Sequence, residues 1–398
     1  MSKSCLILAL LVGLALQDSI YNQNILTDPD AKCLDGSPGS YYVSEGSGVN
    51  KTKFVVYFEG GGWCGAGDLA TTLESCYQRS RTDLGSSKAY PKSYNLAGWG
   101  LLAGEANVNH LYYDWTRIYI KYCTGTGHQG TKSASVSYKG TELWFRGHNV
   151  TIAILDSLQK SYGIFNEGTE ILVSGCSAGG LAAYTWANYI YSRAKGRVIT
   201  APDSGLFLDS QNVAQKDYAY RNSFINFMKI SNVEIDPPIP ECVKDNPNEK
   251  WRCMFAQYQF PYIRTPLFPV NSLYDSWSIP NILGIHCESS ASLKGCTTQE
   301  RAVLEAYRKN TSDILTAMVA SDSRNGAWGV ACSDHCYMHY APWNNANFEV
   351  PTKSGFTIQT SLEAWMKNER GNNKHIDTVS WPDNGACAGA TVNQLLLG

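Results

Sequence analysis

The sequence has little charge and no large excess of either sign. Asp, Glu, Lys and Arg make up 17% of the 398 residues, below the ~25% usual in globular domains, and the net charge is −2 at pH 7. A nucleic-acid-binding protein would need a strong basic excess, which is absent here. Intrinsic disorder needs high charge and few aromatic residues, whereas 12% of this chain is aromatic. The composition therefore indicates a globular protein with a large buried core.

The sequence also has no apolar run long enough to cross a membrane. The run from Leu6 to Leu16 has 11 residues, and a spanning helix needs about 20. Lys3 precedes this run and Asp18 ends it, which is the pattern of a secretory signal peptide. We therefore expect residues 1–17 to be a signal peptide and the protein to be secreted, or to enter a lysosome-like compartment, without a membrane span.

Cysteine, in contrast, is abundant. Of the 13 cysteines, Cys5 lies in the expected signal peptide, and the other 12 predict up to six disulfides in an oxidising compartment. Connectivity does not follow from sequence, but close spacing suggests four local pairs. These are Cys64–Cys76, Cys242–Cys253, Cys287–Cys296 and Cys332–Cys336. A zinc site is disfavoured because no Cys-x-x-Cys pair is present, so we expect no metal.

Three Asn-x-Ser/Thr sequons occur in the chain. In a secreted protein such sequons mark surface positions that can carry glycans. The expected glycosylation sites are Asn50, Asn149 and Asn310.

The sequence contains no internal repeat, no low-complexity tract and no clear Pro/Gly/Ser-rich linker, so we expect residues 18–398 to form one domain. Short apolar runs alternate with helical patterns, which predicts a mostly parallel sheet flanked by helices. The expected strands are residues 54–58, 117–122, 171–173, 197–200 and 267–270, and the expected helices are 150–162 and 180–194. Residues 232–262, with two cysteines and few periodic apolar positions, are expected to be a disulfide-pinned insertion.

The clearest chemical motif is Gly-Cys-Ser-Ala-Gly at residues 175–179. This is the G-x-S-x-G pattern of a nucleophile elbow, in which a sharp strand-to-helix turn presents a serine hydroxyl. An expected strand precedes the motif and an expected helix follows it, which is the required context. Ser177 is therefore the candidate nucleophile. Cys176 is a weak alternative nucleophile, because the 12 cysteines outside the expected signal peptide are an even number, which favours a disulfide at this position.

A serine nucleophile needs a base, usually a histidine oriented by a carboxylate. Four histidines follow Ser177 in the sequence: His286, His335, His339 and His375. His335 is favoured because two flanking cysteines can fix its loop. His339 is the local competitor, although a packing role suits it better, and His286 is expected to be structural.

Two aspartates could orient this base. Asp275 and Asp203 each follow an expected strand, where α/β proteins present catalytic groups. Spacing favours Asp275 and leaves Asp203 open, since Asp203 could instead brace a turn through its side chain.

Acyl transfer also needs hydrogen-bond donors for the oxyanion. The segment Glu-Gly-Gly-Gly-Trp-Cys at residues 59–64 follows an expected strand, and its glycines can turn backbone N–H groups into a pocket. The N–H of Ala178 is the expected second donor. A phosphate-binding loop is disfavoured, because neither Gly-Lys-Ser/Thr nor G-x-G-x-x-G is present.

Taken together, these motifs resemble the pectin acetylesterase family, which includes plant pectin acetylesterases and animal Notum carboxylesterases. The resemblance covers roughly residues 30–340. The matching segments are residues 58–64, 122–123, 143–147, 174–180, 203–209, 271–277 and 332–336. The Gly-Gly-Gly-Trp-Cys and Gly-Cys-Ser-Ala-Gly-Gly forms are closer to the plant members.

The resemblance implies an α/β-hydrolase-like fold and a catalytic triad of Ser177, Asp275 and His335. It also implies an oxyanion hole formed by Gly61, Gly62 and Ala178.

Two segments depart from the family pattern. Residues 124–130, which include His128, form a loop that we expect to border the pocket, and residues 337–339 match only in part.

The expected function is a secreted serine carboxylesterase that removes O-acetyl groups from a pectin-like polysaccharide and needs no cofactor. The alternatives are a Notum-like enzyme that removes a fatty acyl group from a protein, a non-catalytic glycan-binding protein of the same fold, and a secreted serine peptidase. The expected partner is thus an acetylated polysaccharide or an acylated protein, and the sequence does not predict an oligomeric state.

Overall fold

The computed structural model describes residues 19–65, 67–233, 239–287, 293, 295–339, 341–345, 348–367 and 373–381. The expected signal peptide at 1–17, together with Cys5 and Cys387, lies outside these residues. Across the described part of the chain, no helix has both the length and the apolar character to cross a bilayer.

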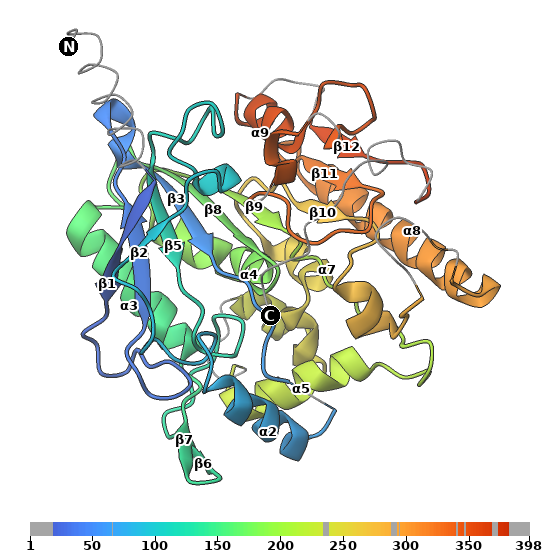
Figure 1. The fold of residues 1–398 in the computed structure, drawn as a ribbon, viewed down its shortest axis with the longest axis horizontal. Helices are drawn as coiled ribbons and strands as arrows, with labels where there is room; N and C mark the ends of the chain where they lie inside the picture. The colour runs from blue at the N-terminus through green and yellow to red at the C-terminus, as the bar shows by residue number, and fades with distance from the viewer. Residues whose placement is uncertain are drawn as a thin grey trace, which may run out of the picture.

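A ten-stranded sheet forms the centre of the molecule (Figure 1). Its strand order is β12-β11-β10-β9-β8-β3-β5-β2-β1-β4. The strands from β12 to β5 run parallel, and β2, β1 and β4 extend the sheet antiparallel. Their bounds are β1 Ile20–Ile25, β2 Ser40–Ser44, β3 Lys53–Phe58, β4 Ser93–Asn95, β5 Thr116–Ile120, β8 Glu170–Cys176, β9 Arg197–Asp203, β10 Val270–Ser272, β11 Ala327–Val330 and β12 Lys374–Ile376. A separate hairpin consists of β6 Val136–Tyr138 and β7 Thr141–Leu143.

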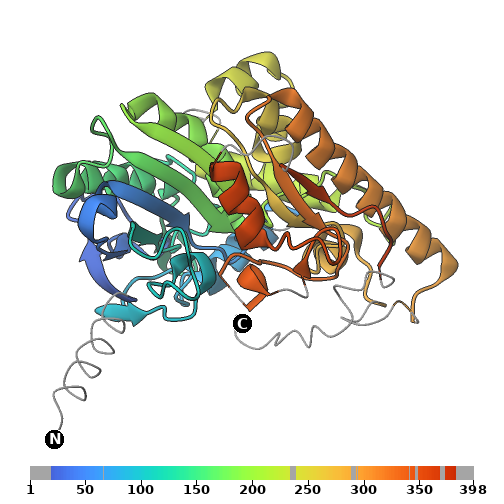
Figure 2. The same cartoon turned by 90° about the horizontal axis from the view of Figure 1, so that it is seen from above.

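Helices cover both faces of this sheet (Figure 2). On one face α3 and α4 pack against alternate residues of β3, namely Phe54, Val56 and Phe58. On the other face α9 and the loops that precede it share a core with Val55 and Tyr57. This division follows from the two-residue period of a strand, which sends successive side chains to opposite faces. The helices are α2 Leu69–Arg79, α3 Gly147–Tyr162, α4 Ala178–Arg193, α5 Ala219–Ser231, α6 Pro240–Asp245, α7 Ala256–Gln259, α8 Thr298–Ser321 and α9 Ile358–Met366.

The predicted mostly parallel sheet flanked by helices is confirmed. The predicted helix at 150–162 falls within α3, and the one at 180–194 matches α4 except for Ala194, which lies just beyond its end. The predicted strand at 267–270 is wrong in its bounds, because β10 starts only at Val270. Pro269 has no backbone N–H to donate, so it cannot hydrogen-bond to both neighbouring strands as a residue of a central strand does. Leu267 instead forms an isolated bridge with Thr200.

Five disulfides join described cysteines. Three of the predicted local pairs are present, namely Cys64–Cys76, Cys242–Cys253 and Cys287–Cys296, and the second of these pins the predicted insertion. The fourth predicted pair, Cys332–Cys336, is wrong. Cys336 is bonded to Cys176, and Cys332 forms a disulfide with a different cysteine. The reason is that the loop after β11 turns back across the end of β9 and brings residue 336 to the end of β8.

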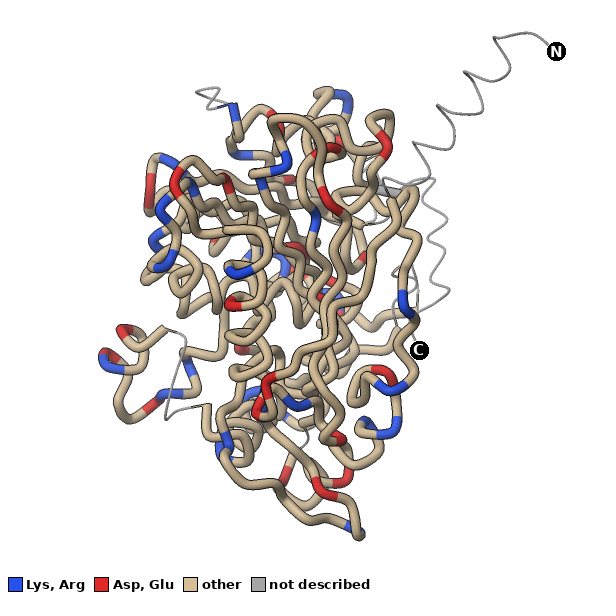
Figure 3. Tube along the Cα trace, turned by 90° about the vertical axis from the view of Figure 1, so that its left-hand side faces the viewer, with Lys and Arg blue, Asp and Glu red and all other residues tan. Residues whose placement is uncertain are grey.

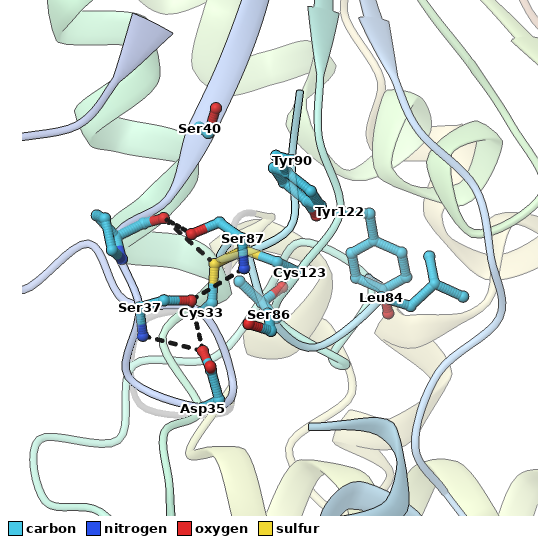
Figure 4. Close-up of a disulfide and its surroundings, with 12 residues drawn as sticks. Cys33, Asp35, Ser37, Ser40, Leu84, Ser86, Ser87, Tyr90, Tyr122 and Cys123 are labelled. Atoms are coloured by element: carbon cyan, nitrogen blue, oxygen red, sulfur yellow. Dashed lines mark hydrogen bonds between the residues drawn. A yellow bond between two sulfur atoms is a disulfide. The ribbon is translucent and has the colours of Figure 1, made fainter. Parts of the chain in front are cut away.

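The fifth disulfide, Cys33–Cys123, ties the N-terminal region to the loop after β5 (Figure 4). Around it, Ser37 accepts a hydrogen bond from the backbone N–H of Ser87, and Asp35 accepts one from the backbone N–H of Ser37. This region therefore braces the loop that begins at Cys123.

The three sequons lie in different surroundings. Asn310 is exposed on α8, whereas Asn50 and Asn149 are half-buried. The side chain of Asn50 already donates a hydrogen bond to Asp114. Exposure therefore favours Asn310 as a position that a glycan can occupy.

Candidate active site

Ser177 lies at the sharp turn between β8 and α4. Its backbone adopts φ 60° and ψ −123°, a region that non-glycine residues rarely occupy and that is common at functional sites. The N–H of Ser177 donates to the carbonyl of Asp203 at the end of β9. The local geometry is that of a nucleophile elbow, in which the turn raises the serine above the carboxyl edge of the sheet.

Glycines make this turn possible because helix α4 starts in direct contact with two strands. A Cβ on Gly179 would lie 2.0 Å from the carbonyl oxygen of Phe58, and one on Gly180 would lie 2.2 Å from that of Asp203. These distances are far shorter than any real carbon–oxygen contact. Both positions therefore exclude every other amino acid.

Asp275 and His335 come together from two neighbouring loops. Asp275 follows β10, is buried, and accepts a hydrogen bond of 2.8 Å from the N–H of Ser278 through Oδ1. Its Oδ2 lies 2.6 Å from Nδ1 of His335. Among the described residues Nε2 of His335 has no hydrogen-bond partner. The imidazole thus has one nitrogen held by a carboxylate and the other available.

The environment of His335 sets its protonation. Burial lowers the pKa of His335, but the carboxylate of Asp275, with Asp203 and Asp334 as further negative charges, raises it above its ordinary value. Burial also raises the pKa of Asp334 to about 7. The imidazolium form is therefore stabilised by the acidic groups around it.

The Cys176–Cys336 disulfide brings the imidazole to the nucleophile elbow. One ring nitrogen of His335 and the two sulfur atoms all lie within 4.8 Å of one another. Cys176 directly precedes Ser177 in the sequence, so the histidine lies beside the elbow. Because both sulfurs belong to a disulfide, this group offers no thiolate to a metal ion.

The glycine-rich loop at residues 59–64 packs on the same elbow. A Cβ on Gly60 would lie 2.6 Å from the carbonyl oxygen of Cys176 and 3.0 Å from Cβ of Ser177. Gly61 and Gly62 have φ of 124° and 63°, which favour glycine. In the part of the chain that the structure describes, the N–H groups of these two glycines have no backbone acceptor.

Ala178 is the first residue of α4. The N–H groups of the first helical turn have no partner inside the helix, and the helix dipole gives them a partial positive charge. The N–H of Ala178 is therefore of the kind that stabilises an anion. The N–H groups of Gly61 and Gly62, which have no backbone acceptor among the described residues, are further donors of this kind.

A buried ion pair supports the glycine-rich loop, and the sequence analysis did not identify it. Glu59 pairs with Lys121, which follows β5. The Glu59 carboxylate also accepts hydrogen bonds from the hydroxyl of Tyr119 at 2.8 Å and from the N–H of Tyr122 at 2.6 Å. Acidic and basic residues directly after two adjacent parallel strands were the signal in the sequence that could have revealed this pair.

The loop at residues 124–130 packs against the glycine-rich loop and hydrogen-bonds to both of its ends. Nε2 of His128 lies 2.9 Å from the carbonyl oxygen of Glu59, and the His128 ring stacks on Tyr122. Burial lowers the pKa of His128 to about 4, so this side chain is neutral at physiological pH. The N–H of Cys64 donates to the carbonyl of Gly125. The loop is buried along its whole described length up to Gly130, and its histidine faces the protein interior.

The other histidines named in the sequence analysis have different surroundings. His339 is buried, stacks on Trp99, and its Nδ1 lies 2.7 Å from the hydroxyl of Tyr57. Burial lowers the pKa of His339 to about 3, so it is a neutral packing residue. His286 is exposed, and His375 lies buried on β12.

Aromatic side chains flank the imidazole on one side. Phe207 and Trp277 lie with ring centroids 6.2 and 6.5 Å from that of His335. Trp63, from the glycine-rich loop, contacts both of these rings as well as Tyr220 and Phe224. We call Trp63, Phe207, Tyr220, Phe224 and Trp277 the aromatic cluster.

Comparison with known proteins agrees with this picture. The family model described as pectinacetylesterase matches residues 15–388. Pectin acetylesterase 11 of Arabidopsis thaliana is 30% identical over 399 residues and covers 97% of each chain. Pectin acetylesterase 7 of the same plant is 31% identical over 347 residues, with 84% of each chain covered.

More distant relatives have a different named substrate. The human palmitoleoyl-protein carboxylesterase NOTUM is 22% identical over 392 residues, covering 90% of this chain and 71% of the relative. The crystal structure of the Wnt deacylase Notum from Drosophila has a TM-score of 0.75 at 20% identity, covering 92% of this chain and 99% of that one. The predicted α/β-hydrolase-like fold is thereby confirmed.

The named relatives share one chemistry, the hydrolysis of a carboxylic ester, and the family match extends over almost the whole sequence. The protein is a carboxylesterase, and the chain belongs to the pectinacetylesterase family.

Proposed function

We propose that the protein hydrolyses esters through a covalent acyl-enzyme. Ser177 is the nucleophile, His335 is the general base, and Asp275 is the carboxylate that orients the imidazole of His335. The observation that carries the proposal is the 2.6 Å contact between Asp275 Oδ2 and His335 Nδ1, with the imidazole beside the Ser177 elbow. The contact fixes the tautomer in which Nδ1 holds the proton. Nε2 is then free to accept the serine proton.

The first half-reaction transfers the acyl group. His335 removes the hydroxyl proton as Ser177 attacks the ester carbonyl carbon, and Asp275 stabilises the imidazolium. The N–H groups of Gly61, Gly62 and Ala178 donate to the negatively charged oxygen of the tetrahedral intermediate. The C–O bond to the alcohol then breaks, and His335 returns its proton to the leaving alkoxide.

The second half-reaction releases the acid. His335 removes a proton from a water molecule, which attacks the acyl-serine ester. The same N–H groups stabilise the second tetrahedral intermediate. Ser177 leaves with the proton from His335, so the enzyme is restored and the net reaction is the addition of one water to one ester.

The favoured substrate is an O-acetyl ester on a pectin-like polysaccharide. Two observations support a short acyl group. The relatives that are 30–31% identical are pectin acetylesterases. In addition, Trp63 contacts four other rings, two of which flank His335, and a long acyl chain entering on that side would have to separate them.

We further propose that the protein is secreted and that residues 1–17 are its signal peptide. Five disulfides in the described residues support an oxidising compartment. N-terminal sequencing of the protein recovered from the medium tests this directly. A mature N-terminus that still began at Met1 would contradict it.

The test of the function is hydrolysis of nitrophenyl esters from acetate to palmitate, followed by release of acetate from acetylated pectin. Fast turnover of acetate that is lost in Ser177→Ala supports the acetylesterase. A long-chain optimum would instead favour removal of a fatty acyl group from a protein. Folded protein without Ser177-dependent turnover of any ester would overturn the proposal and favour a glycan-binding role.

A further inference from the structure

One buried carboxylate beside the site takes no part in the proposed proton transfer. Asp203 is the last residue of β9 and is fully buried. Asp275, not Asp203, contacts the His335 ring. A buried carboxylate costs free energy unless hydrogen bonds satisfy it, and burial does raise the pKa of Asp203 to about 6. Its place next to the site therefore calls for an explanation.

The hydrogen bonds of Asp203 lead to the loop that holds the histidine. We call residues 332–338 the histidine loop. Oδ2 of Asp203 accepts hydrogen bonds of 2.7 Å from the backbone N–H groups of both Tyr337 and Met338. Oδ1 accepts one of 3.0 Å from the hydroxyl of Ser204. A single carboxylate thus fixes two successive peptide groups just after His335.

Ser204 extends the same connection. Its hydroxyl oxygen accepts a hydrogen bond of 2.9 Å from the N–H of Cys336. Three successive backbone N–H groups, at residues 336 to 338, are therefore bound by the side chains of Asp203 and Ser204. Cys336 has φ 68° and Ser204 has φ 49°, both unfavourable for side-chain-bearing residues. These hydrogen bonds offset that strain and define the path of the histidine loop.

The backbone of Asp203 acts on the nucleophile. Its carbonyl accepts a 3.0 Å hydrogen bond from the N–H of Ser177, and Asp203 is the register partner of Cys176 in the parallel pairing of β9 with β8. One residue therefore contacts the nucleophile through its main chain and the histidine loop through its side chain.

Resting on the proposed function, we propose that Asp203 is a positioning residue: it sets the distance and direction between the Ser177 hydroxyl and the His335 imidazole, and Ser204 assists it. The disulfide Cys176–Cys336 ties the same two segments but leaves the peptide groups of residues 336–338 free to rotate. The hydrogen bonds to Asp203 and Ser204 remove that freedom. Catalysis depends steeply on such geometry, since a displacement of about 1 Å can cost about 10²-fold in rate.

The experiment compares Asp203→Ala, Asp203→Asn and Ser204→Ala with Asp209→Asn. Asp209 is the matched control, because it is a buried carboxylate that follows the same strand but binds Arg221 and Tyr258 instead. For each variant, kcat and KM for nitrophenyl acetate are measured together with the thermal midpoint. A fluorophosphonate, which labels activated serines, reports on Ser177 independently of acetate turnover.

We expect Asp203→Ala to lower kcat and the labelling rate by about 10²-fold with KM changed less than about threefold. Asp203→Asn should recover much of this loss, because its amide oxygen can accept both N–H groups of residues 337 and 338. Ser204→Ala should show a smaller loss of the same kind. Asp209→Asn should leave kcat and labelling near the wild-type values.

A wild-type kcat in folded Asp203→Ala, or a loss of kcat in Asp209→Asn equal to that in the Asp203 variants, would overturn the inference. If Asp203→Ala does not fold, Ser204→Ala decides, and unchanged kcat and labelling in that folded variant would overturn the inference. Failure of the proposed function gives a different result, namely no Ser177-dependent turnover in the wild-type protein itself.

Discussion

Cys176 and Cys336 are joined by a disulfide that spans 160 residues of sequence, and each is the immediate neighbour of a proposed catalytic residue. Ser177 follows the first cysteine and His335 precedes the second. The nucleophile and its base are thus linked by a covalent path as well as by packing. The importance of this link can be measured separately from that of the other disulfides.

Replacing both cysteines, in Cys176→Ala with Cys336→Ala, is expected to lower kcat roughly 10- to 100-fold, because the histidine loop loses one of its ties to the elbow. The free energy of unfolding should fall by about 2–5 kcal/mol. Denaturant unfolding and ester turnover measure the two effects. The control is the double replacement of Cys287 and Cys296, whose bond spans only 9 residues and whose loss should leave kcat unchanged. An equal loss of kcat in both double variants would contradict the special role of the first bond.

Activity should rise with pH through the pKa of His335. Only the neutral imidazole can accept the Ser177 proton, and the pKa of His335 is raised because Asp275 and its neighbours outweigh burial. The acid limb of kcat/KM should therefore lie above the ordinary histidine value of about 6.5. The profile is measured with a neutral ester between pH 4 and 9.

Asp275→Asn should lower the maximal rate and shift the pH midpoint of the acid limb of kcat/KM. Burial, which lowers the pKa of His335, is then opposed only by the weaker effects of Asp203 and Asp334, so the limb should move to lower pH. The maximal rate should fall by about 10⁴-fold, the size of the effect of the same change in a serine protease triad. A limb that stayed in place would mean that another group titrates.

The oxyanion donors can be tested at Gly62. Gly62 has φ 63° and open space where a Cβ would go, so Gly62→Ala adds roughly 1–2 kcal/mol of backbone strain without a clash. The strain should rotate the donor N–H groups and lower kcat, by up to about 10²-fold for the loss of one donor. Gly355→Ala is the matched control, since Gly355 also has a left-handed backbone and open space. Equal kcat in the two variants, both folded, would remove Gly62 from the oxyanion hole.

The aromatic cluster should determine acyl-chain length. Trp63→Ala removes the ring that contacts the other four members, and we expect the ratio of octanoate to acetate turnover to rise at least about tenfold, since each buried methylene contributes about 0.8 kcal/mol. Trp251→Ala is the control, because Trp251 packs on Phe255 and Tyr258 instead. An unchanged ratio in Trp63→Ala would show that acyl length is set elsewhere.

The central strands and the elbow were predictable because their signals are local. Residues 54–58 and 171–173 are continuous apolar runs that become β3 and β8, and the elbow follows directly after β8. The antiparallel strands β1, β2 and β4 carry no comparable pattern. Helix α8 was missed, although Thr297 and Glu300 form a capping box at its start, which is a readable signal.

The relationships between distant segments were not predictable. Asp275 and Asp203 each follow a strand, and their spacing favours Asp275 without deciding which one reaches the histidine. The fold decides it, because β10 lies between β9 and β11 and places Asp275 next to the loop that follows β11. For the same reason Cys336 pairs with a cysteine 160 residues away and not with Cys332.

The glycines that pack the elbow against β3 and β9 also bear on how such an enzyme can diversify. At Gly179 and Gly180 even one methyl group would overlap a main-chain oxygen, so descendants of this gene can hardly vary there. Trp63 and Phe207 have no such restriction, because their contacts are with other side chains. We therefore expect the choice of ester to change through the aromatic residues, while the glycines of the elbow stay the same.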